Sequence, residues 1–274
     1  MKDEKIKAMW PEELKEYMQR EREEDYLLVD VRQPQEYEVE HIPGALLIPL
    51  PQVMKDVTRV PVNKNLIFYC AHGIRSRVAA ERCADSGRHP HAIYSLTGGI
   101  AAWEAQVVTD VPKLEIFNDL SAPTDWVKTA MNLEKGAFLF YDYVIKKCTD
   151  TDLVKALVDI SVMETAHARL IYNLFPRDER STEMFQDVYG ALSGDIVEGG
   201  QPLSELCRQL EAMPGPFMTN ALEMALRIEY AAYDLYRSLA DQSEDERIQK
   251  ALLNLSQAEK KHVDRVARLF ENAF

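Results

Sequence analysis

The spacing of apolar residues divides the chain into two parts with different periodicities. In the first, residues 1 to about 110, short apolar runs alternate with helical stretches that are separated by Pro and Gly. The runs are YLLVDV (26–31), ALLIPL (45–50), NLIFYC (65–70) and AIYSL (92–96), and the helical stretches are PEELKEYMQRE (11–21) and RSRVAAERCADSG (75–87). Short, β-branched and aromatic runs of this kind are typical of buried strands. The pattern predicts an α/β domain with a mostly parallel sheet and flanking helices.

From about residue 120 the strand pattern ends and the apolar residues recur with a helical period. Four long helices are expected at 123–148, 151–175, 216–241 and 244–273. The connection 176–215 joins the second helix to the third, and two short helices are expected within it. Such a crossover is needed when a four-helix bundle is not simply up-down-up-down. We therefore expect domains at 1–112 and 120–274, the second an all-α four-helix bundle.

Each long helix carries a glutamate within its apolar face, at Glu134, Glu164, Glu229 and Glu259. In the second and fourth helices a histidine follows three residues later, and residues three apart share a helix face. The two histidines are His167 and His262. Glu134 and Glu164 are 30 positions apart, as are Glu229 and Glu259. This matched spacing predicts two similar helical hairpins that bring the acidic side chains to one level.

Turns are expected near the midpoints of the two pairs, at Thr149 and Glu244. At the second turn, Ser243 and Glu246 have the spacing of a capping box. Tyr141, Tyr233 and Tyr236 lie on the same apolar faces as the glutamates. We expect these tyrosines to pack in the core, with hydrogen bonding to the acidic cluster as the alternative.

Four carboxylates in one bundle centre would be prohibitively costly without partners, because each isolated buried charge costs at least several kcal/mol. Two divalent cations remove the problem, since they neutralise four carboxylates and leave two neutral imidazoles as nitrogen ligands. One Glu from each of two helices with Glu-x-x-His from each of the others is the ligand set of dinuclear carboxylate bundles. The ligand types favour iron, or manganese, over structural zinc. The alternatives are an exposed Glu-x-x-His pair without metal and a purely structural cluster.

With these motifs, residues 120–274 resemble the ferritin-like superfamily, and rubrerythrins in particular. The resemblance implies two iron ions, with manganese as the alternative, and reaction with peroxide or dioxygen. It assigns the metal to Glu134, Glu164, His167, Glu229, Glu259 and His262. Two features depart from the family. Rubrerythrins carry an additional carboxylate on the third helix, where this chain has Leu226 and Ala232, and the chain lacks the C-x-x-C pairs of a rubredoxin domain.

The segment YCAHGIRSR (69–77) places a cysteine between an expected strand and an expected helix. Backbone N–H groups and the positive helix end would surround Cys70 there and lower the pKa of its thiol. Gly73 permits a tight loop, and Arg75 adds a cation. Residues 69–95 contain four arginines against two acidic residues, which predicts a positive pocket for a small anionic substrate. The alternative is an inert core cysteine.

Two further segments, VDVRQPQEYEVEHIPGALLIP (29–49) and LTGGIAAW (96–103), extend this motif. Together the three resemble the rhodanese family over about residues 5–110. The resemblance implies that Cys70 accepts a sulfane sulfur and passes it to a nucleophile. It also implies that Arg75 binds an anionic sulfur donor and that the loop supplies donors from Ala71, His72, Gly73, Ile74 and Ser76. The six-residue loop matches sulfurtransferases rather than the related phosphatases. Asp30 and Arg32 are expected to brace the strand ends.

The net charge of −13 argues against nucleic acid and against anionic membranes as partners. No apolar run approaches the roughly 18–20 residues of a membrane span, and the first residues lack a signal-peptide core. Four widely separated cysteines give no disulfide framework, so we expect a cytoplasmic protein. We expect a homodimeric two-domain enzyme whose sulfur acceptor and electron donor the sequence does not identify. The alternative is a non-catalytic sulfur carrier with a metal-binding or metal-sensing bundle.

Overall fold

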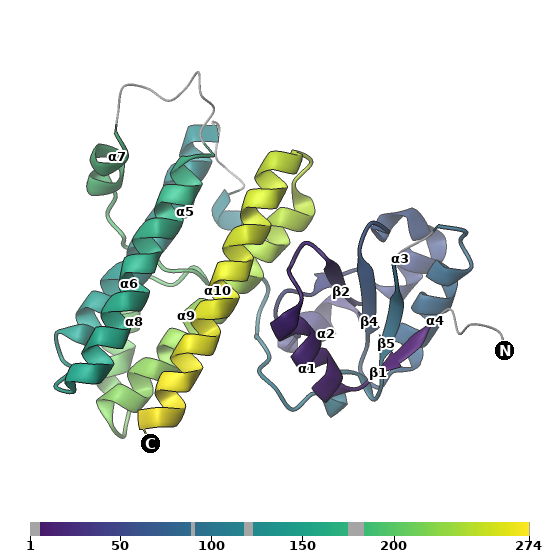
Figure 1. The fold of residues 1–274 in the computed structure, drawn as a ribbon, viewed down its shortest axis with the longest axis horizontal. Helices are drawn as coiled ribbons and strands as arrows, with labels where there is room; N and C mark the ends of the chain where they lie inside the picture. Colours follow the sequence, from purple (N-terminus) through teal and green to yellow (C-terminus); the bar gives the residue numbers. More distant parts are fainter. Residues whose placement is uncertain (1–5, 89–90, 118–122, 175–183, 274) are drawn as a thin grey trace. The chain divides into compact units, whose positions relative to one another are not determined.

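The computed structural model describes residues 6–88, 91–117, 123–174 and 184–273 (Figure 1). The chain divides into two compact units, Met1–Val111 and Pro112–Phe274. The first unit alternates strands and helices, and the second is built from helices, as the periodicity predicts. Among the described helices, none combines the length and apolar character that crossing a membrane requires.

The first unit contains a five-stranded parallel sheet. Its strands are β1 (Lys7–Met9), β2 (Tyr26–Asp30), β3 (Leu46–Leu47), β4 (Asn65–Tyr69) and β5 (Ile93–Leu96). They are arranged in the order β1-β5-β4-β2-β3, and all neighbours are parallel. The four expected strands are present as β2 to β5. The central strands β2 and β4 are buried on both faces, which explains their continuous apolar sequences.

Helices cover both faces of this sheet. The elements between the strands are α1 (Pro11–Arg20), α2 (Pro34–Val39), α3 (Leu50–Lys55), η1 (Val57–Arg59) and α4 (Ile74–Ala84), and η2 (Gly99–Ala102) follows β5. Leu27 of β2 belongs to a core cluster with Val53 of α3 and Ala79 of α4, whereas Leu28 belongs to a cluster with Leu14 of α1 and Tyr37 of α2. Because successive strand residues face opposite sides, each face of the sheet has its own core.

The second unit contains the four expected long helices, which lie side by side in Figure 1. They are α5 (Pro123–Ile145), α6 (Thr151–Tyr172), α9 (Phe217–Gln242) and α10 (Glu246–Ala273), with η3 (Leu114–Phe117) before them and α7 (Phe185–Ala191) and α8 (Leu203–Ala212) in the crossover. Residues 175–183 of that crossover lie outside the described part of the chain. α5 packs against α6 and α9 against α10, so the bundle consists of two hairpins.

Both hairpin turns occur where the glutamate spacing places them. Asp150 caps α6, and Asp245 caps α10 by accepting hydrogen bonds from the N–H groups of Arg247 and Ile248 at 2.8 and 3.1 Å. The expected capping box of Ser243 with Glu246 is therefore wrong. The helix begins directly after Asp245, whose short carboxylate reaches the free N–H groups of the first turn.

Candidate functional sites

Cys70 lies where the sequence places it, directly after β4 and before α4. Gly73 caps α4 in the left-handed region, with φ of 93°. The positive φ strains any residue with a side chain, and a Cβ at this glycine would also make tight contacts of 3.3 Å with Gly98 N and Leu96 O. The loop Ala71–Ser76 is thereby folded tightly around the sulfur.

The Cys70 thiol, only 1% exposed, is surrounded by hydrogen-bond donors. The N–H of Gly73 donates to Sγ at 3.1 Å, and Ser76 Oγ lies 3.7 Å from Sγ. Burial raises the pKa of Cys70, but hydrogen bonds from the backbone and hydroxyl of Ser76 and from the backbone of His72 and Gly73 lower it by more. The thiolate is therefore favoured relative to an ordinary cysteine, as expected from the sequence.

The LTGGIAAW segment supports this loop from outside. The N–H groups of Ile100 and Ala101 donate to the carbonyl groups of Cys70 and Ala71 at 2.8 and 3.0 Å. A Cβ at Gly99 would overlap the Cys70 carbonyl oxygen, so the close approach of the two backbones requires glycine there. These bonds occupy the loop carbonyls and leave its N–H groups directed toward the sulfur.

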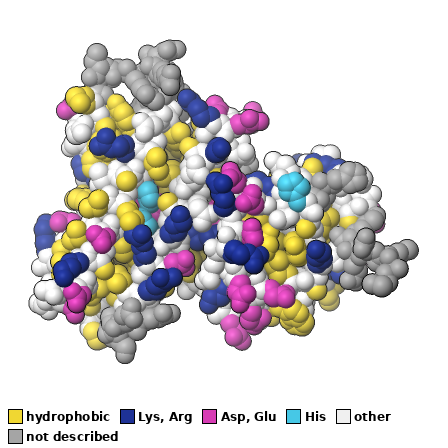
Figure 2. All heavy atoms as spheres, in the orientation of Figure 1, with side chains coloured by type: hydrophobic (Ala, Val, Ile, Leu, Met, Phe, Trp, Pro, Cys, Tyr) yellow, Lys and Arg dark blue, Asp and Glu magenta, His cyan; other side chains and the backbone are white. Residues whose placement is uncertain are grey.

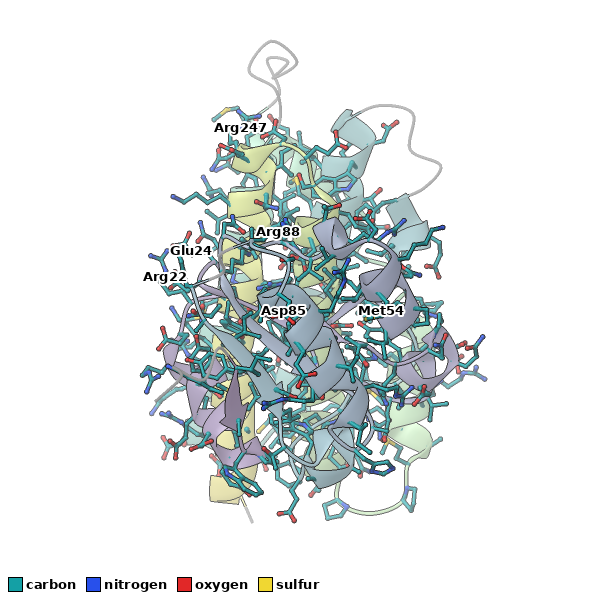
Figure 3. The ribbon with its side chains drawn as sticks, turned by 90° about the vertical axis from the view of Figure 1, so that its right-hand side faces the viewer. Arg22, Glu24, Met54, Asp85, Arg88 and Arg247 are labelled. Carbon is teal, nitrogen blue, oxygen red and sulfur yellow. The ribbon has the colours of Figure 1, made fainter. Side chains whose placement is uncertain are left out.

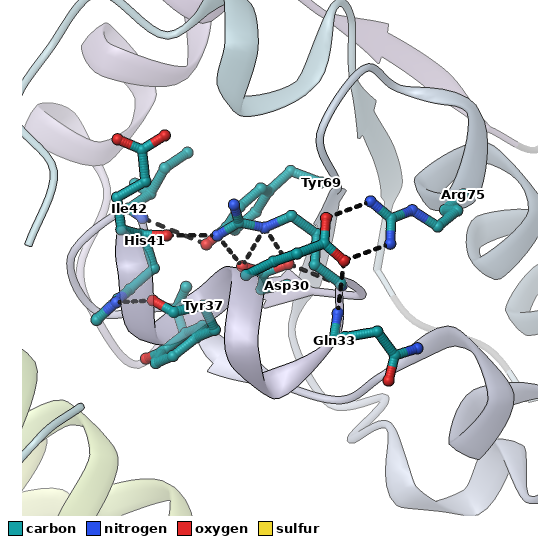
Figure 4. Close-up of polar contacts among 11 residues, drawn as sticks. Asp30, Gln33, Tyr37, His41, Ile42, Tyr69 and Arg75 are labelled. Atoms are coloured by element: carbon teal, nitrogen blue, oxygen red, sulfur yellow. Dashed lines mark hydrogen bonds and ion pairs between the residues drawn. The ribbon is translucent and has the colours of Figure 1, made fainter. Parts of the chain in front are cut away.

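Arg75 has a partner that the sequence analysis did not identify. Its guanidinium donates two hydrogen bonds to the carboxylate of Glu36, both 2.7 Å long (Figure 4). The hydrogen bonds from Arg75 hold the pKa of Glu36 at about 2. Arg75 also interacts with the thiol of Cys70, which together with Glu36 raises the pKa of Arg75. Glu36 begins the EYEVEHIPG part of the segment 29–49. Nothing in the sequence connects it to Arg75, which is 39 residues away.

The other arginines contribute less to a positive pocket than the sequence suggests. Arg77 pairs with Glu81 at 3.1 Å. Arg88, labelled in Figure 3, donates to the carbonyl groups of Val57 and Val60 at 2.7 Å. On the face shown in Figure 2, acidic and basic side chains are interspersed. The positive potential at Cys70 therefore comes chiefly from the loop N–H groups and from Arg75.

Asp30 and Arg32 form a buried ion pair at the end of β2 (Figure 4). Arg32 donates to Asp30 at 2.7 Å and to the Glu40 carbonyl at 2.7 Å, which ties the end of β2 to the chain after α2. Their contacts agree with the expected bracing role. At the loop itself, the side chains of His72 and Ile74 are exposed, Ile74 by 76%.

The six expected metal ligands meet in the bundle centre, and all are buried. Ligand atoms of Glu164, His167, Glu259 and His262 lie within 4.8 Å of one another. The two imidazole rings stack with centroids 4.8 Å apart. Both turn Nδ1 toward the carboxylates, so the two Glu-x-x-His pairs face each other across the bundle.

The carboxylates form two half-sites, one around each histidine. His167 Nδ1 lies 3.4 Å from Glu134, 3.5 Å from Glu164 and 2.7 Å from Glu259. His262 Nδ1 lies 3.3 Å from Glu229, 3.2 Å from Glu164 and 3.4 Å from Glu259. Glu164 and Glu259 each direct one oxygen to each half-site, as bridging ligands would. Glu134 and Glu229 each belong to one half-site, as terminal ligands would.

The donor set fits two divalent cations. Glu134 Oε2, Glu164 Oε1, Glu259 Oε1 and the Nδ1 atoms of both histidines are buried without a hydrogen-bond partner in the described part of the chain. Burial, followed by the neighbouring acidic groups, raises the pKa of Glu134 and of Glu229 to about 8. Carboxylate oxygens and imidazole nitrogens converge here at ion-pair distances, and deprotonated imidazoles would leave their lone pairs available to a metal.

Two tyrosines bind the outer oxygens of the terminal glutamates. Tyr141 donates its hydroxyl proton to Glu229 Oε1, and Tyr236 donates to Glu134 Oε1. Both tyrosines pack in the core as expected, and their hydroxyl groups also make the hydrogen bonds to the acidic cluster that were the alternative. Tyr233 is also buried. Tyr141 and Tyr236 each lie seven residues after a glutamate, two helical turns along the same face. This spacing is the feature of the sequence that indicates their contact with the acidic cluster.

One acidic residue near the cluster was missed by the sequence analysis. Glu198 comes from the crossover between α7 and α8 and is buried beside the centre. Its charge interacts with those of Glu134, Glu164 and Glu259. It has no helical periodicity to reveal it, and only the following pair Gly199–Gly200 marks the position as unusual.

Fold and sites together define a sulfurtransferase-type α/β domain followed by a carboxylate-histidine helical bundle. Comparison with known families agrees: the model of the rhodanese-like domain matches residues 11–106, and that of rubrerythrin matches residues 220–274. The chain therefore belongs to the rhodanese family through its first unit, and residues 220–274 of its second unit match rubrerythrin.

Two curated sulfurtransferases are among the similar proteins. The thiosulfate sulfurtransferase GlpE of Coxiella burnetii is 33% identical over 81 residues, covering 30% of this chain and 74% of the relative. The adenylyltransferase and sulfurtransferase MOCS3 of Drosophila ananassae is 31% identical over 122 residues, covering 40% of this chain and 27% of the relative. The chain thus spans about a quarter of the length of that relative. A rhodanese-like domain protein from Staphylococcus aureus is 26% identical over 38% of this chain and 98% of its own, with a TM-score of 0.34.

Proposed function

We propose that the protein is a sulfurtransferase that works through a Cys70 persulfide, joined to a dinuclear iron centre that reacts with peroxide or dioxygen. The observation that carries the first part is the Cys70 thiol, whose pKa is lowered by hydrogen bonds from the loop Ala71–Ser76. The single most direct support for the second part is the set of five unpartnered donor atoms in the bundle centre.

In the first step, the Cys70 thiolate attacks the sulfane sulfur of a small anionic donor such as thiosulfate. A bond forms between Sγ and that sulfur, and the sulfur–sulfur bond of the donor breaks, so its electron pair leaves with the sulfite. Cys70 then carries a persulfide whose outer sulfur is negatively charged. The N–H groups of His72, Gly73 and Ser76 stabilise this charge as they stabilise the thiolate.

In the second step, a thiolate or cyanide attacks the outer sulfur of the persulfide. The new bond takes that sulfur to the acceptor, and the electron pair of the broken bond returns to Cys70 as thiolate. No net oxidation occurs, and the same loop N–H groups hold the negative charge before and after transfer. Arg75 is placed beside the sulfur to orient an anionic donor or acceptor.

In the bundle, the six expected ligands would hold two iron ions, which when bound supply redox chemistry with peroxide or dioxygen. The residues themselves position and shield the centre. Tyr141 and Tyr236 fix the outer oxygens of the terminal glutamates, so the inner oxygens remain directed at the cations. The buried surroundings exclude bulk water from the imidazoles of His167 and His262.

The sulfurtransferase proposal is tested by incubating the full chain with thiosulfate and cyanide and measuring thiocyanate. Wild-type protein and a Cys148→Ser control should form it, whereas Cys70→Ser should not. Mass spectrometry after thiosulfate alone should show one added sulfur on Cys70. Thiocyanate formation that is undiminished in Cys70→Ser would contradict the proposal.

A sulfur carrier without turnover is the second candidate, and the Arg75–Glu36 pair favours it. The carboxylate neutralises the cation that would attract thiosulfate, and Cys70 is buried. Such a carrier would accept sulfur from a persulfide donor instead. Persulfide loading of Cys70 from a protein or small-molecule persulfide, with no thiocyanate from thiosulfate, would identify the carrier.

The oxidoreductase proposal is tested on protein that has been loaded with iron and reduced under anaerobic conditions. Hydrogen peroxide or dioxygen should reoxidise the wild-type centre faster than that of Glu164→Ala, which loses the carboxylate that lies near both histidines. Equal rates in both proteins would contradict the oxidoreductase role and leave a metal-binding bundle.

A further inference from the structure

Glu198 is a buried carboxylate that the bundle pattern does not explain. It is 3% exposed, and its Oε2 has no hydrogen-bond partner within the described ranges. A buried, unpaired carboxylate is strongly unfavourable unless a cation or a proton compensates it. The segment that carries it is not a regular helix, so its position depends on how the crossover is attached to the bundle.

Asn132, two residues before Glu134 on α5, fixes the start of the crossover segment that carries Glu198, at Gly194 and Asp195. Its side-chain oxygen accepts the N–H of Gly194 at 2.8 Å, and its side-chain nitrogen donates to Asp195 Oδ1 at 2.9 Å. An asparagine amide is used here as both acceptor and donor, which ties the crossover to α5 at one defined register.

Lys135, the residue after Glu134, binds the preceding part of the crossover. Its ammonium group donates to the carbonyl groups of Tyr189 and Leu192 at 2.9 and 2.5 Å. These carbonyls lie at the end of α7, where the chain leaves helical geometry and its acceptors need partners.

The backbone of the crossover approaches α5 most closely at Gly136, two residues after Glu134. A Cβ at this position would overlap the carbonyl oxygen of Ile196 and would lie 3.3 Å from Val197 Cγ1. Glycine inside a helix is unfavourable by itself, so its use here accommodates the crossover backbone against α5.

The crossover segment that carries Glu198 also contacts α9. A Cβ at Gly199 would lie 3.4 Å from the Cβ of Ala231, which is two residues after Glu229. Glu198 therefore enters the bundle between α5 and α9, at the level of the terminal glutamates.

The segment that carries Glu198 approaches the bundle most closely at Gly136, two residues after Glu134, which places Glu198 beside the Glu134 half-site. Burial raises its pKa, and the charges of Glu134, Glu164 and Glu259 raise it further. These three carboxylates are the ones that surround His167 Nδ1. The two hairpins are otherwise matched, so this carboxylate makes the two half-sites unequal.

We propose that Glu198 is a further carboxylate ligand of the dinuclear centre and serves the cation held by Glu134 and His167. The inference deepens the proposed metal centre and rests on it. With Glu198 ionised, five carboxylates face two divalent cations, which leaves one negative charge in excess. That excess favours a higher positive charge on the metals, so Glu198 should lower the reduction potential of the centre.

The test is an anaerobic titration of the metal-free full chain with Co²⁺, followed by visible absorption, which reports the coordination of each ion. Wild-type protein and Glu223→Gln, which removes an exposed charge on α9, should bind two ions alike. In Glu198→Gln, one binding step should weaken by at least about tenfold while the other is preserved. In Glu198→Asp the charge remains but the carboxylate is one methylene shorter, so the same step should weaken. In the iron-loaded protein, Glu198→Gln should raise the reduction potential.

Superimposable Co²⁺ titrations and equal potentials for wild-type and Glu198→Gln protein would overturn the inference and leave the metal centre standing. Wild-type protein that binds no second cation would instead overturn the metal centre and this inference with it. Loss of the helical circular dichroism signal in metal-free Glu198→Gln would also contradict it, because a ligand is not needed to fold the metal-free bundle. The expected metal-free variant is at least as heat-stable as wild type, since it loses an unpaired buried carboxylate.

Discussion

Tyr141 of α5 binds Glu229 of α9 through its hydroxyl group, and a tyrosine of α9 makes the equivalent bond to a glutamate of α5. Tyr236 of α9 binds Glu134 of α5 in the same way. Each tyrosine lies two helical turns beyond a glutamate on its own helix and binds the glutamate of the other. The internal repeat therefore extends beyond the ligands to the groups that orient them.

We expect Tyr141→Phe and Tyr236→Phe each to weaken metal binding by about 10- to 100-fold, because each removes the hydrogen bond that orients a terminal ligand. Tyr141→Phe should affect the His262 half-site and Tyr236→Phe the His167 half-site. Tyr143→Phe is the control, since Tyr143 is on α5 but binds Glu211 away from the centre. Co²⁺ titration measures the effect, and unchanged binding in both site variants would show that the tyrosines only fill space.

Ser76→Ala should raise the pKa of Cys70. Ser76 Oγ lies near the sulfur and also bonds to Gly73 O and Ser95 Oγ, both at 3.0 Å. Losing a hydroxyl that stabilises the thiolate favours the thiol, so the pH of half-maximal alkylation by iodoacetamide should move upward by about one unit, equivalent to about 1.4 kcal/mol. Ser86→Ala is the control, because Ser86 bonds to the Cys83 carbonyl at the far end of α4. An unchanged or lower alkylation pH in Ser76→Ala would refute this role.

Glu36→Gln should lower the KM for thiosulfate. The carboxylate of Glu36 neutralises Arg75, so removing its charge releases a cation beside Cys70. An interaction with a partly exposed ion pair is worth about 1 kcal/mol or less, so a change of up to about fivefold is expected. Arg75→Ala should raise KM instead. A higher KM in Glu36→Gln would indicate that Glu36 is needed to hold Arg75 in position.

Gly136→Ala should destabilise the second unit although alanine favours helices. The added Cβ would overlap Ile196 O and force the crossover away from α5. Overpacking of this kind costs about 1–3 kcal/mol. Gly190→Ala in α7 is the matched control, since a Cβ there meets nothing within 4 Å and the change should be neutral or stabilising by up to about 1 kcal/mol. Urea denaturation followed by circular dichroism measures both, and equal stability of the two variants would contradict the close approach.

Much of the fold is local enough to be predicted from the sequence. The strands β2 and β4 are continuous apolar runs because both faces are buried, and the long helices keep their period over more than five turns. β1 was missed because only three residues, Lys7 to Met9, pair with β5, and one of the three is buried. Its strand conformation depends on the partner strand and not on its own pattern.

The site residues likewise divide into those that a local sequence pattern reveals and those that depend on distant partners. The six expected ligands lie on long helices, where periodicity reveals them, and Cys70 lies at a strand–helix junction that the sequence also shows. Glu36 and Glu198 act through contacts with distant residues, and their own neighbours in sequence give no periodic signal. Glu198 in particular depends on Asn132, Lys135 and Gly136 to reach the centre.

The most direct test of the central claim, that six buried side chains hold two cations, is anomalous X-ray scattering from crystals at the iron and manganese absorption edges. The account predicts two anomalous peaks at the iron edge, one beside His167 Nδ1 and one beside His262 Nδ1, with Glu164 and Glu259 between them. Reconstituted crystals that show no peak there, or with the six side chains turned to separate neighbours, would contradict it.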